Sequence, residues 1–255
     1  MVLSMERWIG KIAVVTGASS GIGAAIAGRL VKEGVKVAGL GRRVERIEEN
    51  AKKLSEEKGE LHAIKTDVTK EEDILNAFKW VADNLGPVSI LINSAGIYRD
   101  PPLMSGKTEE WKAVIDTNVM GLCIATREAI KSMQANKIDG HILHINSYLG
   151  HKIPASPGLS IYATSKSAVT TLTETMRHEL IAAGSKIKIS SVSPGMVETE
   201  MTVFSKILSE ERLNLLKQLA SIKDEDVVDA LIYNLSTPPH VQVHEMIIKP
   251  VGEMY

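Results

Sequence analysis

Short apolar runs alternate along the chain with longer stretches that mix polar and apolar residues. The apolar runs, of which the β-branched run from Ile12 to Val15 is typical, predict strands, and the stretches between them predict helices. The expected strands are residues 12–16, 35–40, 61–65, 88–92, 140–146, 186–192 and 243–249. The expected helices are residues 22–33, 44–57, 70–84, 108–134, 160–182 and 224–235. This alternation indicates an α/β fold in which helices cover both faces of a parallel sheet.

The segments that follow three of the expected strands carry residues suited to binding. Residues 93–96 (Asn-Ser-Ala-Gly), Ser147 and the pair Pro194-Gly195 each come just after a strand. In an open parallel sheet the carboxyl ends of the strands lie along one edge, and ligands bind there. We therefore expect these distant segments to meet at a single site.

Length, charge and cysteine content narrow the class of protein. A chain of 255 residues fits one domain spanning residues 1–255. The 30 basic and 31 acidic residues almost balance, which argues against nucleic acid or an anionic membrane as a partner. The single cysteine, Cys123, lies among apolar residues, so we expect a buried structural thiol in a reducing compartment. The sequence has neither a signal-peptide pattern nor an apolar run of about 18 residues, so we expect a cytoplasmic protein.

The first expected strand leads into a glycine-rich turn and then a helix. The run Gly17-x-x-x-Gly21-x-Gly23 lets the backbone approach a phosphate at the helix N-terminus, where free N–H groups and the helix dipole favour an anion. The spacing differs from the dinucleotide-binding pattern G-x-G-x-x-G, since Ile26 stands where the third glycine would be. A tight strand–helix turn without a ligand is the alternative.

Tyr162 and Lys166 lie four residues apart within an expected helix, so their side chains project from the same face. A free phenol has a pKa near ~10, and an adjacent ammonium favours the phenolate and draws that pKa towards neutral pH. The pair therefore suits a proton donor and the group that tunes it. Taken alone, the same spacing also arises by chance on solvated helix faces.

Six short motifs occur in a fixed order along the chain. They are Thr-Gly-x-x-x-Gly-x-Gly at residues 16–23, Asn-Ser-Ala-Gly at 93–96, Asn118, Ser147, Tyr-x-x-x-Lys at 162–166 and Pro-Gly at 194–195. Together they resemble the short-chain dehydrogenase/reductase family over nearly the whole chain. The one departure is Ser94, where a second asparagine is more usual. Residues 145–199 resemble the subgroup of insect farnesol-dehydrogenase-like enzymes and vertebrate broad-specificity keto-steroid and carbonyl reductases.

The resemblance implies both a fold and an assembly. The fold is a Rossmann-type, doubly wound sheet of seven parallel strands in the order 3-2-1-4-5-6-7, with helices on both faces. Relatives pair two long helices, here residues 108–134 and 160–182, across a two-fold axis, so we expect a homodimer. The apolar strand at residues 243–248 could add a second axis and give a homotetramer.

The resemblance also assigns catalytic roles to four residues. Tyr162 would protonate the developing alkoxide while hydride reaches the carbonyl carbon. Ser147, fifteen residues earlier, would hydrogen-bond the substrate oxygen. Lys166 would lower the pKa of Tyr162 and bind the nicotinamide ribose. Asn118 would hold a water that links Lys166 to solvent.

The implied cofactor is a nicotinamide dinucleotide, bound by residues at the carboxyl edge of the sheet. Besides Tyr162 and Lys166, the expected contacts are Gly17, Ser19, Gly21, Ile22, Asp67, Val68, Asn93, Gly96, Pro194, Gly195, Val197 and Thr199. For Asp67, capping of the following helix is an equal alternative.

The end of the second strand indicates which dinucleotide is preferred. In relatives that use NAD, an acidic residue at this point binds both ribose hydroxyls. Here the strand runs into Arg42 and Arg43 with no acidic residue. Guanidinium groups bind a 2′-phosphate through forked, charge-assisted hydrogen bonds, so NADP(H) is the expected cofactor. Two solvated arginines at the start of a helix are the alternative.

The expected substrate pocket is apolar around the hydroxyl groups of Ser147 and Tyr162. Its expected lining is Ile97, Leu149, His151, Ile153, Met196, Met201, Phe204 and Leu208. These residues include no arginine or lysine, and burying an unpaired anion is costly, so charged substrates are disfavoured. His141 and His144 lie three apart on a strand and face opposite sides, so we expect no metal site from them.

The sequence therefore predicts an NADP(H)-dependent enzyme that reduces apolar ketones and aldehydes, such as isoprenoid or steroid carbonyl compounds, or oxidises their alcohols. One alternative is a catalytically silent dinucleotide-binding regulator of the same fold, although the presence of all four catalytic residues argues against it. A second is a sugar-nucleotide epimerase, which shares Tyr-x-x-x-Lys but usually carries a further substrate domain.

Overall fold

The computed structural model describes residues 3–99, 101–153, 159–199 and 220–253. Within them, seven parallel strands form one sheet in the order β3-β2-β1-β4-β5-β6-β7, which confirms the expected topology. The strands are β1 (Ile12–Thr16), β2 (Lys36–Gly41), β3 (Glu60–Lys65), β4 (Val88–Asn93), β5 (His141–Ile145), β6 (Lys188–Pro194) and β7 (Glu245–Ile248).

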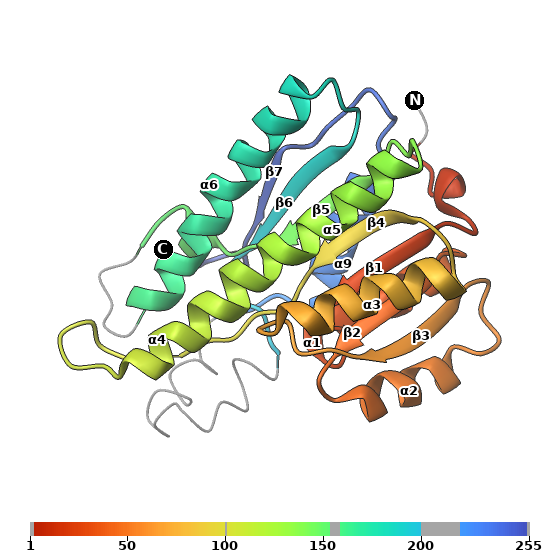
Figure 1. Ribbon diagram of the computed structural model, residues 1–255. Coiled ribbons are helices and arrows are strands. Elements are labelled where there is room, and N and C mark those ends of the chain that lie inside the picture. Colours follow the sequence, from red (N-terminus) through yellow and green to blue (C-terminus); the bar gives the residue numbers. More distant parts are fainter. Residues whose placement is uncertain (1–2, 100, 154–158, 200–219, 254–255) are drawn as a thin grey trace.

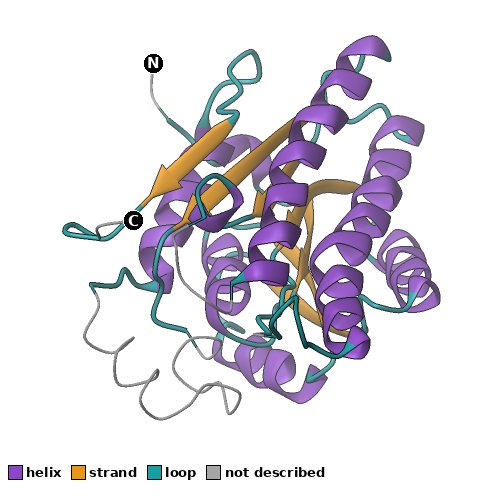
Figure 2. Cartoon of the chain, turned by 90° about the vertical axis from the view of Figure 1, so that its left-hand side faces the viewer, coloured by secondary structure: helices purple, strands orange, loops and turns teal. Residues whose placement is uncertain are grey.

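Helices cover both faces of this sheet (Figures 1 and 2). They are α1 (Gly21–Lys32), α2 (Val44–Lys53), α3 (Glu71–Asn84), α4 (Thr108–Ile115), α5 (Gly121–Ala135), α6 (Ser160–Ala182) and α9 (Asp224–Ser236). Two short 3-10 turns, η1 (Glu6–Trp8) and η3 (Tyr148–Gly150), and a π-helical turn, η2 (Asp116–Met120), complete the described helical elements. Figure 1 shows α3, α5 and α6 on the near face, with α1 and α9 behind the sheet.

The apolar runs of the sequence become the middle of a three-layer core. Every residue of β1, β4, β5 and β6 is buried, because these strands have helices on both sides. One core packs side chains of α1 and α9, such as Ile26 and Leu231, against the sheet. The other packs side chains of α3 and α5, such as Ile74 and Ala129, against the opposite face.

Three predicted boundaries were wrong. The helix expected at residues 108–134 is interrupted by a π-helical turn, η2 (Asp116–Met120), between α4 and α5. Helix α2 ends at Lys53 rather than residue 57, where the N–H of Leu54 bonds the carbonyls of both Asn50 and Ala51. Strand β6 runs on through Pro194, because the N–H of Gly195 continues the ladder to the Ile248 carbonyl at 2.8 Å.

Two further expectations concern the burial of Cys123 and the presence of a membrane-spanning helix. Cys123 is only half-buried, so the expected fully buried thiol was wrong, although burial still raises the pKa of the thiol. Across the described residues, we find no helix that combines the length and apolarity required to cross a bilayer.

Candidate active site

The glycine turn after β1 has the geometry of an anion site. Gly17 and Gly21 have φ angles of 72° and 52°, which favour glycine. A Cβ on Gly17 would lie 2.8 Å from the Ala95 Cα, so the turn after β4 packs directly on this glycine. Helix α1 begins here. Its N-cap residue is Ser20, whose side chain makes no capping hydrogen bond to the first turn of the helix. Its free N–H groups therefore suit a phosphate.

Thr16 joins the first two binding segments. Its Oγ1 accepts hydrogen bonds from the backbone N–H groups of Ser94 and Ala95, both at 3.1 Å. Sequence reasoning quoted Thr16 only as part of a motif and gave it no role. Its signal was its position, a hydroxyl residue at the end of the first strand just before the first glycine.

Asn93 faces the core rather than the open edge of the sheet. Its Nδ2 donates to the Thr126 Oγ1 at 2.9 Å and contacts the His144 Nδ1 at 3.1 Å. Burial, and to a smaller degree the charge of Lys166, lowers the pKa of His144 to about 3, so this ring is neutral. Asn93 and His144 thus fix the shape of the turn from beneath.

The two arginines after β2 take different partners. The Arg43 Nη2 donates to the Ser20 Oγ at 2.6 Å, which ties Arg43 to the glycine turn. Arg42 lies close enough to Asp67 for its charge to help lower the pKa of that carboxyl. Ser20 was missed by sequence reasoning, which named its neighbour Ser19. The arrangement places the Arg43 guanidinium beside the glycine turn and the Arg42 charge near Asp67 at the end of β3.

Asp67 caps a turn and does not cap a helix. Its Oδ1 accepts from the N–H and the Oγ1 of Thr69 at 3.1 and 2.8 Å, whereas the N-cap position of α3 is Lys70. Burial opposes ionisation of Asp67, but the bonds from Thr69 outweigh it and the pKa is lowered. Asp67 is therefore a fixed carboxylate at the carboxyl end of β3.

The segment after β6 closes over the glycine turn from the other side. A Cβ on Gly21 would meet the Thr199 Cβ at 3.5 Å, so residues 178 positions apart in the sequence are in contact. Val197 is buried and pairs with Ile222 in an isolated bridge. The two expected cofactor-binding segments thus lie face to face.

Ser147 and Tyr162 meet, although fifteen residues separate them. The Ser147 Oγ accepts from the Leu149 N–H at 3.2 Å, which starts η3, and the Ser147 and Tyr162 hydroxyls are hydrogen-bonded. Lys166 is buried one turn along α6, and its Nζ donates to the Ile145 carbonyl at 2.9 Å. Its Nζ lies 5.8 Å from the Tyr162 ring centroid. The expected triad of hydroxyl, phenol and ammonium is in place.

The expected lowering of the Tyr162 pKa was wrong. Desolvation raises the pKa of Tyr162 to about 12, against the smaller lowering effect of the Ser147 hydrogen bond. Desolvation also lowers the pKa of Lys166 to about 8. Desolvation dominates the pKa of Tyr162 because the Lys166 ammonium is directed at the Ile145 carbonyl rather than at the phenol. At neutral pH the phenol keeps its proton, as a proton donor must.

Asn118 explains the break in the expected long helix. Its Oδ1 accepts from the Ile97 N–H at 2.8 Å, and its Nδ2 donates to the Ile97 carbonyl at 3.0 Å. The same Nδ2 donates to the Ser165 Oγ at 3.0 Å on α6. The π-helical turn presents Asn118 between these segments, and such turns occur often at functional sites. Its role in a water relay stays a prediction.

The substrate side holds one aromatic residue that sequence reasoning missed. Tyr98 packs edge-on against Tyr162, with ring centroids 5.4 Å apart. Its signal was its position directly after Ile97, which was named. Lys249 follows β7, and its Nζ lies 3.8 Å from the Tyr148 ring centroid. The expected lining residues themselves include no arginine or lysine.

Several expected wall residues are placed differently or not described. The His151 Nε2 contacts the Ser193 Oγ at 2.9 Å on β6, and Ile153 is 62% exposed. Met201, Phe204 and Leu208 lie outside the described residues. The other expected residues all follow the carboxyl ends of strands on the same edge: Ser19, Ile22, Val68, Gly96, Ile97, Leu149, Gly195 and Met196.

The remaining histidine of β5 belongs to the core. His141 is fully buried, and its Nε2 contacts the Ser190 Oγ at 2.9 Å. Desolvation, with help from the charges of Lys188 and Arg7, lowers its pKa well below the usual value. Over the part of the chain that the structure describes, no group of three or more possible ligands could hold a metal ion.

Comparison with known proteins agrees with this geometry. The family model for short chain dehydrogenases matches residues 11–207. A farnesol dehydrogenase of Aedes aegypti is 51% identical over 98% of this chain and 100% of its own length. Dehydrogenase/reductase SDR family member 11 of Bos taurus is 43% identical, with the same two coverages.

A solved structure agrees as well. The alcohol dehydrogenase of the archaeon Thermococcus sibiricus, complexed with 5-hydroxy-NADP, has a TM-score of 0.81 and 27% identity, over 94% of this chain and 97% of that one. The family model spans β1 to β6 and so includes the glycine turn and the Tyr162–Lys166 pair, and the relatives extend over nearly the whole chain. This chain belongs to the short-chain dehydrogenase family of oxidoreductases.

Proposed function

We propose that this protein is an NADP(H)-dependent oxidoreductase that interconverts apolar ketones or aldehydes and their alcohols. The observation that carries the proposal is the hydrogen bond between Ser147 and Tyr162 beside the buried ammonium of Lys166. These groups stand on the same sheet edge as the glycine turn. The printed name of the Aedes aegypti relative, farnesol dehydrogenase, supports an isoprenoid alcohol or aldehyde as substrate.

The nicotinamide would donate hydride to the carbonyl carbon, or accept it from the alcohol. Ser147 would hold the carbonyl oxygen by a hydrogen bond, a fixed donor aimed where negative charge develops. Tyr162, whose pKa of about 12 keeps it protonated, would deliver its proton to that oxygen. Lys166, charged at neutral pH, would stabilise the resulting phenolate. Reprotonation of Tyr162 completes the cycle.

Preference for NADP(H) over NAD(H) rests on the two arginines after β2. Arg43 is already held against the glycine turn by Ser20, so less side-chain freedom is lost when it binds a phosphate. Arg42 is exposed, and its charge acts on Asp67 at the end of β3, so it stands on the same edge of the sheet. The Thermococcus sibiricus relative is complexed with an NADP derivative, which supports the same preference.

An apolar substrate is favoured by the side chains around the two hydroxyls. Ile97, Leu149 and Met196 are partly buried and would line this space, and Tyr98 adds an aromatic surface beside Tyr162. Each methylene buried against such a surface contributes about 0.8 kcal/mol, so kcat/KM should rise with substrate apolarity until the pocket is full. Lys249 is engaged with the Tyr148 ring and is a weaker anion partner for that reason.

A panel of carbonyl compounds, followed by NADPH oxidation, tests the proposed activity. We expect farnesal-like and keto-steroid compounds to be turned over and short keto acids or sugar phosphates to be poor substrates. Turnover of a charged two- or three-carbon substrate with none of the apolar compounds would contradict the substrate class. Binding of NADPH with no turnover at all would favour a regulatory role instead.

We also propose assembly as a homodimer or homotetramer, in which α5 and α6 pair across a two-fold axis. Light scattering at micromolar concentration checks this, and a monomer would contradict it. The lone cysteine supports a reducing compartment such as the cytoplasm.

A further inference from the structure

The end of the described chain folds back onto the turn after β6. The Gly195 N–H donates to the Ile248 carbonyl, which ties this turn to the end of β7. Beyond β7 the chain makes a tight turn, in which the Glu253 N–H donates to the Pro250 carbonyl at 3.2 Å. The turn reverses the chain and brings the Glu253 side chain to Gly195.

The Glu253 carboxyl group fills the space that a side chain on Gly195 would need. A Cβ built on Gly195 would collide with the Glu253 Oε2 and lie 3.1 Å from its Cδ. The carboxyl group also accepts a hydrogen bond from the Met196 N–H. Its Oε2 is buried and has no hydrogen-bond partner among the described residues. Glu253 therefore carries one satisfied and one unsatisfied oxygen.

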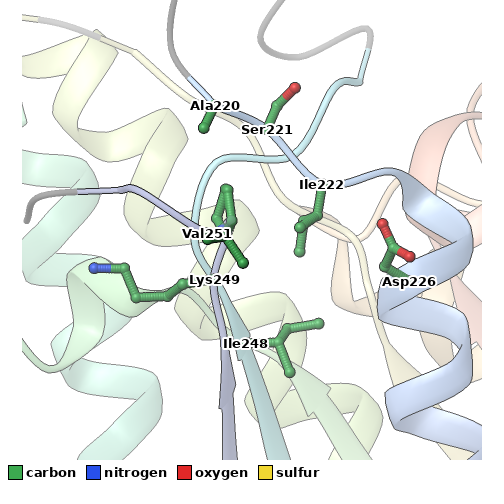
Figure 3. A pocket seen from close by; sticks show the side chains of 8 residues that line it. Ala220, Ser221, Ile222, Asp226, Ile248, Lys249 and Val251 are labelled. Carbon is green, nitrogen blue, oxygen red and sulfur yellow. The ribbon is translucent and has the colours of Figure 1, made fainter.

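The charged groups around Glu253 leave this carboxylate incompletely compensated. Burial raises the pKa of Glu253, and the charge of Lys249 opposes that rise without cancelling it. Lys249 is directed at the Tyr148 ring, and Figure 3 shows its side chain pointing away from Ile222 and Asp226. Lys249 and Asp226 line opposite sides of a groove of about 430 Å³ between residues 220–226 and the end of β7. A further positive charge near Gly195 would therefore stabilise the ionised carboxyl group.

We propose that Glu253 is a cofactor-binding residue that favours the oxidised over the reduced dinucleotide. The proposal rests on the proposed function and on the expectation that Pro194 and Gly195 contact the cofactor, at its nicotinamide ring. The oxidised ring carries a positive charge and the reduced ring is neutral, so a half-buried carboxylate beside this turn attracts only the former. Glu253 thereby biases the ratio of the two dissociation constants without contacting the substrate.

The test is direct measurement of Kd for NADP⁺ and for NADPH by calorimetry or fluorescence, with no substrate present. Glu253→Gln keeps the shape and removes the charge. We expect its Kd for NADP⁺ to rise about fivefold or more, the effect of one unit charge at contact distance in a largely aqueous setting, and its Kd for NADPH to stay within twofold. Glu198→Gln is the matched control, because Glu198 lies on the same turn with an exposed side chain.

A pH series gives a second readout. In the wild type, binding of NADP⁺ relative to NADPH should weaken as the pH falls and Glu253 takes up its proton, whereas Glu253→Gln should lack this change. Titration of the 2′-phosphate is common to both cofactors and cancels in the ratio. Lys166 is present in both variants, so the difference between them isolates Glu253.

The outcomes are distinguishable. Equal changes in both Kd values, or no change in either, would overturn the proposal while leaving the proposed function standing. Failure of the wild type to bind either dinucleotide would overturn both. If Glu253→Gln does not fold, as judged by thermal melting, Glu253→Asp supplies the comparison, since it keeps the charge but withdraws it from Met196. A loss in NADP⁺ affinity alone is then expected, and an unchanged ratio would contradict the proposal.

Discussion

The two ends of the site are built in different ways. The end that we assign to the adenosine part is more local: Gly17, Gly21 and Ser20 belong to one turn, and Arg43 donates a hydrogen bond to the Ser20 Oγ. The end that we assign to the reaction joins segments from η2, η3 and α6, which are distant in sequence. Its side chains are also more deeply buried.

Burial makes the chemistry at the two ends differ. Arg42 and Arg43 are exposed and lie in contact with solvent. Tyr162 and Lys166 lie in a desolvated environment that raises the pKa of Tyr162 to about 12 and lowers the pKa of Lys166 to about 8. Local turns thus fix where an anion can bind, whereas tertiary packing fixes which group can exchange a proton.

The largest expected effect breaks the reaction end alone. Tyr162→Phe keeps the ring and its edge-on contact with Tyr98 but removes the proton donor and the hydrogen bond with Ser147. We expect kcat to fall at least ~10²-fold, the lower bound for general acid catalysis. Steady-state kinetics with an apolar ketone measures this, and Kd for NADPH should stay nearly unchanged. Near-normal turnover would rule out Tyr162 as the acid.

The next effect breaks the adenosine end alone. Replacing Arg42 and Arg43 by Ala removes the groups expected to bind the 2′-phosphate. Each such charge-assisted bond contributes about 1.5–3 kcal/mol, so the preference for NADPH over NADH should fall ten- to a hundredfold. Kd measurements for both cofactors check this. An equal loss for NADPH and NADH would instead indicate that the arginines support the fold of the turn.

The smallest expected effect is on the stability of the folded protein, and it tests how the burial of Lys166 sets the reaction end apart from the exposed arginines. The pKa of Lys166 is 10.5 ordinarily and about 8 in the folded protein, so between these pH values the unfolded chain binds more protons than the folded one. The free energy of unfolding therefore rises with pH across this range.

Lys166→Met removes the buried charge and should abolish that rise. At pH 7 we expect it to stabilise the cofactor-free protein by about 1–2 kcal/mol, since a shift of one pKa unit corresponds to about 1.4 kcal/mol and the lost bond to Ile145 offsets part of the gain. Urea denaturation at pH 7 and pH 9.5 measures both the gain in stability at pH 7 and the loss of the pH dependence. If the variant is less stable than the wild type and its free energy of unfolding still rises with pH, the buried ammonium of Lys166 does not destabilise the folded protein.

The sequence by itself determined the strands and the glycine turn, and its family motifs led to the correct strand order and to the proposed reacting residues. Apolar runs and glycines act locally, and a parallel sheet with helices on both faces is the way to bury such runs. The motif residues, including the pair Tyr162 and Lys166, could also be recognised in the sequence because each motif is a short local pattern.

Tertiary structure alone decided the electrostatics and the partners. The raised pKa of Tyr162, the π-helical turn at Asn118 and the contact of Glu253 with Gly195 each depend on segments far apart in the sequence. A pKa shift depends on how much water is excluded and on where the neighbouring charges point, and neither follows from spacing along a helix. Those quantities exist only once the chain has packed.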